Sequence, residues 1–105
     1  MKKKEKPTYN LAEIQKLLEK EETRHITRLA RKEAVSLRYA DDEEMVRAVL
    51  KIVPSDFFKT MPAEKSVIMQ DVYRYYDKSK NIHLYIKLQI SWHEHKGVII
   101  DFKEK

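Results

Sequence analysis

The spacing of apolar residues divides the chain into a helical half and a strand-like half. In the first half apolar positions recur at intervals of three and four residues, beginning with Leu11 and Ile14. Later in the chain the interval is two, as in NIHLYIKLQIS, residues 81–91, whose even positions are all apolar. A period near 3.6 predicts an amphipathic helix, and a period of two predicts a half-buried strand. We therefore expect helices first and a sheet second.

Three helices are predicted in the first half. Asn10 can cap the first helix, with Glu13 completing a variant of the capping box, and that helix should end near Glu22. The second helix begins near Ile26 and is basic. Asp41 can cap the third helix, whose apolar stripe runs until a proline stops it at position 54. A short helical turn with the sequence DFFKTM is expected to follow.

The second half predicts an antiparallel sheet. Runs rich in β-branched and aromatic residues cover residues 66–76, 81–92 and 97–105, and the polar linkers DKSK and HEHK join them. This order predicts an α+β domain in which the N-terminal helices pack on one face of a C-terminal antiparallel β-sheet. The 105 residues fit one domain, residues 1–105, and residues 1–8 are predicted to be a frayed tail.

Alternation also predicts which side chains share a face of the sheet. In the run 81–91 the aliphatic residues face the core, which leaves Tyr85 and Lys87 on the opposite face. In the last run, the side chains predicted to face the core are those of Val98, Ile100 and Phe102. The opposite face then receives Ile99, Asp101 and Lys103. Alternation does not decide the orientation of the strand at 66–76.

Composition narrows the possible partners and sites. The 22 Lys and Arg residues outnumber the 17 Asp and Glu residues, and the net charge of +5 favours a polyanionic partner without requiring one. The absence of cysteine excludes disulfides and thiolate zinc sites. Gly97 is the single glycine, which excludes the glycine-rich phosphate loop of nucleotide-dependent kinases and dehydrogenases. No apolar run approaches the roughly 18 residues of a membrane span, so we expect no membrane association and a cytoplasmic location.

A basic sheet face that offers tyrosine, lysine, arginine and glutamine suits single-stranded RNA. Lysine and arginine contact phosphates, and aromatic rings stack on unpaired bases for roughly 1–3 kcal/mol each. The residues alone leave a second interpretation open, in which this face is a solvated surface whose charges pair with one another.

Four short motifs follow one another in the second half: SDFFKTM, MQDVYR, LYIKLQI and the terminal FKEK. Together, over residues 55–105, they resemble the MqsR family of toxins from type II toxin–antitoxin modules. The first half agrees more loosely. The resemblance implies a RelE-like fold and an endoribonuclease that cuts messenger RNA at GCU-like sites without a metal or another cofactor. It also implies a protein partner, a zinc-containing, DNA-binding antitoxin of the MqsA type.

The resemblance also assigns site residues. The family's catalytic residues fall on Lys59, Gln70, Tyr85 and Lys103. Arg74 matches a phosphate contact, so Gln70 and Arg74 are predicted to face outward with Tyr85. The remaining RNA contacts that we predict are Tyr73, Lys87 and Phe58.

Each catalytic residue has an expected role. Lys59 would be the general base or a phosphate clamp, and Tyr85 a proton carrier or stacking platform. Lys103 and Arg74 would stabilise charge on the phosphate, and Gln70 would hydrogen-bond the sugar or the phosphate.

The chain departs from the family pattern at three places. Phe58 stands where tyrosine is common, Tyr75 stands where proline is common, and the WHEHKG hairpin is longer. The first change removes a hydroxyl near the site, and the other two are expected to alter the preferred RNA sequence. The alternative function is a non-catalytic module that binds RNA or a protein partner with the same fold.

Other residues have both a structural and a functional interpretation. His93 and His95 resemble a pair of metal ligands but lack a third ligand, which favours a solvated loop and no metal. Trp92 could stack on a base, although its place beside a turn favours a position covering the end of the sheet. Two interpretations fit four basic residues near the second helix: they extend the RNA-binding surface, or they form the solvent-exposed side of that helix. These residues are Arg24, Arg28, Arg31 and Arg38.

Overall fold

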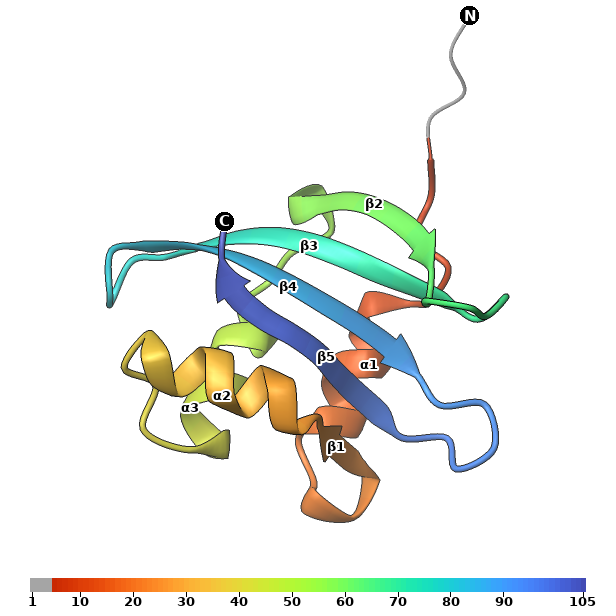
Figure 1. Ribbon diagram of the computed structural model, residues 1–105, viewed down its shortest axis with the longest axis horizontal. Coiled ribbons are helices and arrows are strands. Elements are labelled where there is room, and N and C mark those ends of the chain that lie inside the picture. Colours follow the sequence, from red (N-terminus) through yellow and green to blue (C-terminus); the bar gives the residue numbers. More distant parts are fainter. Residues whose placement is uncertain (1–4) are drawn as a thin grey trace, which may run out of the picture.

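Three helices lie against one face of a five-stranded sheet in the computed structural model, which describes residues 5–105 (Figure 1). The helices are α1 (Leu11–Leu18), α2 (Arg28–Ser36) and α3 (Asp42–Leu50), with short 3-10 turns at Glu21–Thr23 and Pro54–Asp56. The strands are β1 (Arg24–Ile26), β2 (Phe57–Pro62), β3 (Met69–Asp77), β4 (Ile82–Ile90) and β5 (Gly97–Glu104). Their order in the sheet is β1-β5-β4-β3-β2. The predicted α+β fold, with helices on one sheet face, is confirmed.

The predicted helix caps are present. The Asn10 side chain accepts a hydrogen bond from the Glu13 backbone N–H at 3.0 Å, and Asp41 accepts one from Glu44 at 3.0 Å. These bonds satisfy backbone donors that a helix start leaves unpaired. The first helix nevertheless ends at Leu18, earlier than the expected Glu22, because the chain turns there toward β1.

Two strands occupy segments that were predicted to be helical. Ile26, the expected start of the second helix, lies in β1, which pairs in parallel with β5, and Thr27 caps α2 instead. Of the DFFKTM segment, Asp56 ends the turn at Pro54–Asp56, and the other five residues lie in β2, the antiparallel neighbour of β3. A three-residue strand is too short to show a period, and Phe57 and Phe58 are residues that strands favour. The sheet is therefore mixed rather than purely antiparallel.

A bulge in β5 corrects the predicted faces of this strand. Lys87 pairs with Asp101 and Leu88 pairs with Ile99, so Ile100 is an extra residue between the two pairs. Such an insertion resets the alternation of side chains. The sequence-based assignment is thus right for Phe102, Asp101 and Lys103, and wrong for the residues before the bulge, where Ile99 is fully buried in the core and Val98 lies on the opposite face beside Gln89.

The N-terminal segment departs from the expected frayed tail. The backbone N–H groups of Thr8 and Tyr9 donate to the buried carboxylate of Asp71 at 3.0 and 2.9 Å. The Tyr9 hydroxyl donates to the Met69 carbonyl at 2.7 Å, and Glu5 accepts from the Thr60 N–H at 3.3 Å. Residues 5–9 are therefore bound to β2 and β3, and residues 1–4 of the expected tail lie outside the described part of the chain.

Gly97 lies where α1 packs closely against β5. A Cβ atom at this position would lie 3.1 Å from the Ile14 carbonyl oxygen and from side-chain atoms of Leu17 and Leu18. Glycine at this position therefore permits close packing of α1 on the sheet. The helices bury the aliphatic face of β4, and no helix lies over the other face of the sheet.

Candidate functional site

The sheet face opposite the helices carries most of the predicted site residues, and we call it the outer face. In Figure 1, α2 and α3 lie below the sheet and α1 lies behind β4 and β5, so none of the three helices covers the upper face. The strands β2 to β5 supply its residues. They are Phe58, Lys59, Met61, Gln70, Val72, Arg74, Tyr76, His83, Tyr85, Lys87, Gln89, Val98, Asp101 and Lys103.

The strand register aligns these residues in rows across the sheet. Arg74 is opposite Tyr85, and Tyr85 is opposite Lys103, so an arginine, a phenol and an amine lie side by side. Directly opposed residues on one face have Cβ atoms about 5 Å apart. The predicted orientation of Arg74 beside Tyr85 and Lys103 agrees with this register.

Lys59 belongs to the next row on the same face. It pairs with Val72, which pairs with Lys87 of β4. Lys59 therefore lies two strands from Tyr85, about 10 Å across the sheet and about 7 Å along it. The structure brings Tyr85 and Lys103 into direct proximity, and it places Lys59 on the same face at a distance that a long side chain partly bridges.

Aromatic rings hold the cations of this face. The Arg74 guanidinium lies 3.4 Å from the centre of the Phe58 ring, and the Lys59 ammonium lies 5.5 Å from the same ring. The Lys103 ammonium lies 5.0 Å from the Tyr85 ring. Phe58 can face outward next to Lys59 because the register of β2 shifts between Phe57 and Lys59. Such contacts position a cation without neutralising its charge.

The cations differ in whether they have an acidic partner. Within residues 5–105, Lys59, Arg74 and Lys103 form neither an ion pair nor a side-chain hydrogen bond. Lys87 is different, because its ammonium lies 3.2 Å from the Asp101 carboxylate and only 15% of its side chain is exposed. Three cations are thus available to an anion, whereas Asp101 compensates the charge of Lys87.

Gln70 lies on the outer face but is largely covered. It is 8% exposed, and its amide N–H donates to the Gln89 side-chain oxygen at 2.9 Å. The sequence did not identify Gln89 or Asp101 as parts of the site. Once the strands are aligned, Gln89 and Asp101 lie on the same face as Tyr85 and Lys87, and this alignment could have identified them.

The prediction that Tyr73 contacts RNA is wrong. Since Arg74 faces outward, the adjacent Tyr73 faces the helices, where it has no exposed surface and packs edge-on against Phe57. Its hydroxyl finds no hydrogen-bond partner among residues 5–105. Burial, with the nearby Asp71 charge, raises the pKa of Tyr73 to about 12. Tyr73 is therefore a core residue.

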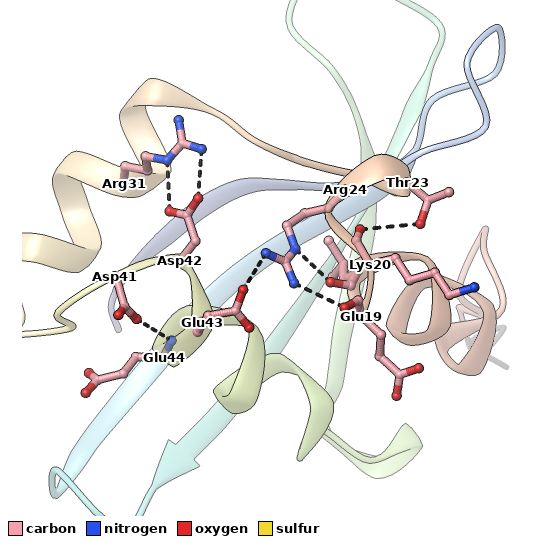
Figure 2. A network of polar contacts seen from close by, with 10 residues as sticks. Glu19, Lys20, Thr23, Arg24, Arg31, Asp41, Asp42, Glu43 and Glu44 are labelled. Carbon is pink, nitrogen blue, oxygen red and sulfur yellow. Dashed lines mark hydrogen bonds and ion pairs between the residues drawn. The ribbon is translucent and has the colours of Figure 1, made fainter.

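Two of the basic residues near the second helix have structural roles, as Figure 2 shows. The Arg24 side chain is only 6% exposed, and it donates to the Leu18 and Glu19 carbonyls at 2.8 and 3.3 Å and pairs with Glu43 at 2.9 Å. It thereby caps the end of α1 and joins it to α3. Arg31 makes two hydrogen bonds of 2.9 Å to Asp42, and these bonds lower the pKa of that carboxyl.

The hairpin between β4 and β5 shows no metal site. His95 lies 3.1 Å from the Glu13 carboxylate of α1, and no group of three His, Cys, Asp or Glu residues within residues 5–105 could hold a metal ion. Trp92 is 77% exposed, so the favoured expectation that it covers the end of the sheet is wrong.

Comparison with known proteins identifies the family. A family model described as "Motility quorum-sensing regulator, toxin of MqsA" matches residues 6–104. A search of curated proteins found no match. In residues 5–105, no helix has the length and hydropathy needed to cross a bilayer. Nearly the whole chain thus fits one family, and it belongs to the MqsR toxins, the toxin partners of an antitoxin in toxin–antitoxin modules.

Proposed function

We propose that the chain is an endoribonuclease that cuts messenger RNA in the cytoplasm through attack of a ribose 2′-OH on the adjacent phosphodiester. The proposal includes metal independence and GCU-like cleavage sites, which the family resemblance implies. One observation carries it. Within residues 5–105, the cations Lys59, Arg74 and Lys103 lack acidic partners and share one uncovered sheet face with Tyr85.

The reaction needs little more than such a face. The 2′-oxygen forms a bond to phosphorus while the bond from phosphorus to the 5′-oxygen breaks, which gives a 2′,3′-cyclic phosphate and a 5′-hydroxyl. The enzyme must accept the proton of the 2′-OH, stabilise the charge on the phosphorane and protonate the leaving oxygen. A positioned acid or base contributes about 10²- to 10⁴-fold, and fixed cations facing the developing charge often contribute more.

The row Arg74–Tyr85–Lys103 suits the second and third tasks. In this proposal Arg74 and Lys103 flank the scissile phosphate and stabilise its charge, while the Tyr85 hydroxyl between them carries a proton. Lys59, in the neighbouring row, acts as the base or clamps the phosphate from the other side. The aromatic contacts of Arg74, Lys103 and Lys59 support this assignment because they fix the cations before RNA arrives.

Gln70 has a narrower role than its neighbours. Its amide N–H already donates to Gln89, so its side-chain oxygen remains to accept a hydrogen bond. We assign that oxygen to the ribose hydroxyl, which is a hydrogen-bond donor. Gln70 lies four residues from Arg74 along β3, about 13 Å from the row Arg74–Tyr85–Lys103, so it would bind the sugar of a neighbouring nucleotide rather than the scissile phosphate.

Two further residues complete the proposed RNA contacts. Phe58 is exposed, with Arg74 close against its ring, and the remaining ring surface can stack on a base. Lys87 contributes less to phosphate binding than Arg74 because of its pairing with Asp101.

The proposed protein partner is a zinc-containing, DNA-binding antitoxin of the MqsA type that neutralises the toxin. The known family membership requires an antitoxin, and the zinc and the DNA binding are part of the proposal.

Cleavage of a defined transcript in EDTA tests the proposal. We expect cuts at GCU-like sites, with 2′,3′-cyclic phosphate and 5′-hydroxyl ends. A chain that shifts the RNA on a gel without cutting it would be the non-catalytic binding module. Loss of cutting in EDTA would contradict metal independence, and 5′-phosphate ends would contradict attack by the 2′-OH.

A further inference from the structure

Two aromatic rings that the proposed mechanism does not use lie in contact on the outer face. Tyr76 of β3 pairs with His83 of β4, in the row next to that of Arg74 and Tyr85. The centres of the Tyr76 and His83 rings are 4.6 Å apart, and the ring planes are inclined by 37°. Tyr76 is 40% exposed, and His83 is exposed as well. An aromatic surface is thus open to solvent on the face that carries Arg74 and Lys103.

The strands and the turn between them fix the position of both rings. Alternation along β3 places Tyr76 on the same face as Arg74, and alternation along β4 places His83 on the same face as Tyr85. The Tyr76 hydroxyl donates to the side-chain oxygen of Asn81. Asn81 has a φ of 55°, which asparagine adopts more readily than most residues, so the turn holds this acceptor in place. Rings that are held before a ligand arrives lose little side-chain freedom when it binds.

The charges around this ring pair favour a ligand that combines an anion with a flat ring. The neighbouring row supplies Arg74 and Lys103, about 7 Å away along the strands. Among the outer-face residues within residues 5–105, the acidic one is Asp101, which pairs with Lys87 on the far side of that row. A nucleotide joins a phosphate to an aromatic base, so its two parts match the cations of one row and the rings of the next.

We propose that Tyr76 and His83 form a platform on which one unpaired RNA base stacks, that of a nucleotide next to the scissile phosphate. This inference rests on the proposed function, and it adds a base-binding subsite to the row that binds the phosphate. The spacing supports it, because about 7 Å between the two rows is close to the length of one nucleotide in an extended strand. Stacking of one base on aromatic side chains strengthens binding by roughly 5- to 150-fold.

Binding of an uncleavable RNA tests the platform. The probe is a GCU-containing oligonucleotide with 2′-O-methyl groups, which block the nucleophile, and the fluorescence anisotropy of a labelled copy measures its affinity. The double variant Tyr76→Ala with His83→Ala should bind it roughly 5- to 150-fold more weakly than the wild type. His83→Phe keeps a ring at this position, so it should retain most of the wild-type affinity.

Abasic nucleotides identify the stacked base. The base on one side of the scissile phosphate is removed in one oligonucleotide, and the base on the other side is removed in a second. One of the two changes should weaken binding to the wild type as much as the loss of the platform does. The same change should have little further effect on the double alanine variant, because the stacking contact is already absent there.

Another exposed ring pair provides the matched control. The Trp92 and His93 ring centres are 5.2 Å apart, Trp92 is 77% exposed, and their hairpin follows the opposite end of β4 from His83. The double variant Trp92→Ala with His93→Ala also removes two aromatic rings, and it should bind the oligonucleotide like the wild type. Equal losses of affinity in the two double variants would contradict a specific platform at Tyr76 and His83.

The outcomes separate this inference from the proposed function. Unchanged affinity without the Tyr76 and His83 rings would overturn the inference and leave the nuclease proposal intact. Loss of cleavage by His83→Phe at wild-type affinity would also overturn it, because the imidazole would then act in the chemistry rather than in stacking. Loss of affinity for the antitoxin but not for RNA would overturn it in favour of protein docking. A wild-type chain that neither binds nor cuts RNA would contradict the proposed function itself.

Discussion

Cationic side chains are used differently on the two sides of the sheet. On the helix side, Arg24 and Arg31 are paired with carboxylates and backbone carbonyls at 2.8–3.3 Å (Figure 2). On the outer face, Arg74 and Lys103 contact aromatic rings and, within residues 5–105, have no acidic partner. A paired cation stabilises the fold, whereas a cation held by a ring keeps its charge available to a ligand. Contact with a ring in place of a carboxylate therefore distinguishes Arg74 and Lys103 from Arg24 and Arg31.

The largest expected effect comes from removing reactive groups of the outer face. Lys59→Ala and Tyr85→Ala should each lower the single-turnover rate of RNA cleavage by about 10²- to 10⁴-fold, because each loses a proton-transfer or charge-stabilising group. Far-ultraviolet circular dichroism should be unchanged, since neither side chain belongs to the hydrophobic core. Wild-type rates in both variants would remove these residues from the mechanism.

Removing Arg24 should act on stability instead. Arg24→Ala leaves the Leu18 and Glu19 carbonyls without their side-chain donor, and we expect the free energy of unfolding to fall by about 2 kcal/mol. Urea titration measures this change. Arg31→Ala is the matched control, because its pair with Asp42 is more exposed and should cost about 0–1 kcal/mol. Cleavage per folded molecule should stay at the wild-type level in both, and a specific loss would contradict their structural role.

The helix side should also determine the response to acid. Burial pushes the pKa of Asp77 up, but hydrogen bonds from Tyr39 at 2.5 Å and from Ser79 at 2.7 Å outweigh it, and the net pKa lies below the ordinary value. The carboxylate form of Asp77 therefore contributes stability above the unfolded pKa near 3.9, and this contribution is lost as the pH falls through the lower folded pKa.

Asp77→Asn tests this acid response. The stability difference between wild type and Asp77→Asn should be largest near neutral pH and should shrink as the pH falls from about 5 to below 3. Thermal unfolding at a series of pH values measures it. A difference that stays constant over this range would show that the ionisation of Asp77 does not contribute.

The smallest expected effect concerns Lys87, which pairs with Asp101 on the outer face. Asp101→Asn should free Lys87 for a phosphate contact and steepen the salt dependence of RNA binding by about 0.7 in the slope of log affinity against log salt. Asp42→Asn, which frees Arg31 on the helix side, is the matched control and should leave the slope unchanged. Equal slopes in the two variants would argue against RNA binding on the outer face.

Much of this arrangement could be predicted from the sequence. The two-residue period of β4 placed Tyr85 and Lys87 on the face away from the core, and the side-chain caps at Asn10 and Asp41 marked two helix starts. These signals are local, because each depends only on residues a few positions apart. Local patterns were therefore sufficient for the presence of three helices, for the three long strands and for the face of Tyr85, but not for the end of α1 or the start of α2.

The errors arose where distant contacts decide the structure. The short strand β1 exists because it pairs with β5, and the bulge at Ile100 is visible only once β5 is aligned with β4. The pairing of Lys87 with Asp101 depends on the same alignment. Tyr73 was an error of another kind, because the outward orientation expected for Arg74 already required its neighbour to face inward.

One measurement tests the division between the two sides most directly. A GCU-containing RNA is incubated in EDTA with the wild type, with a variant in which Lys59, Tyr85 and Lys103 are alanine, and with a variant in which the exposed α2 residues Arg28 and Lys32 are alanine. Both variants lose two positive charges. The wild type and the α2 variant should cut the RNA at similar rates, and the outer-face variant should not cut it. Equal cleavage by all three proteins would contradict the account.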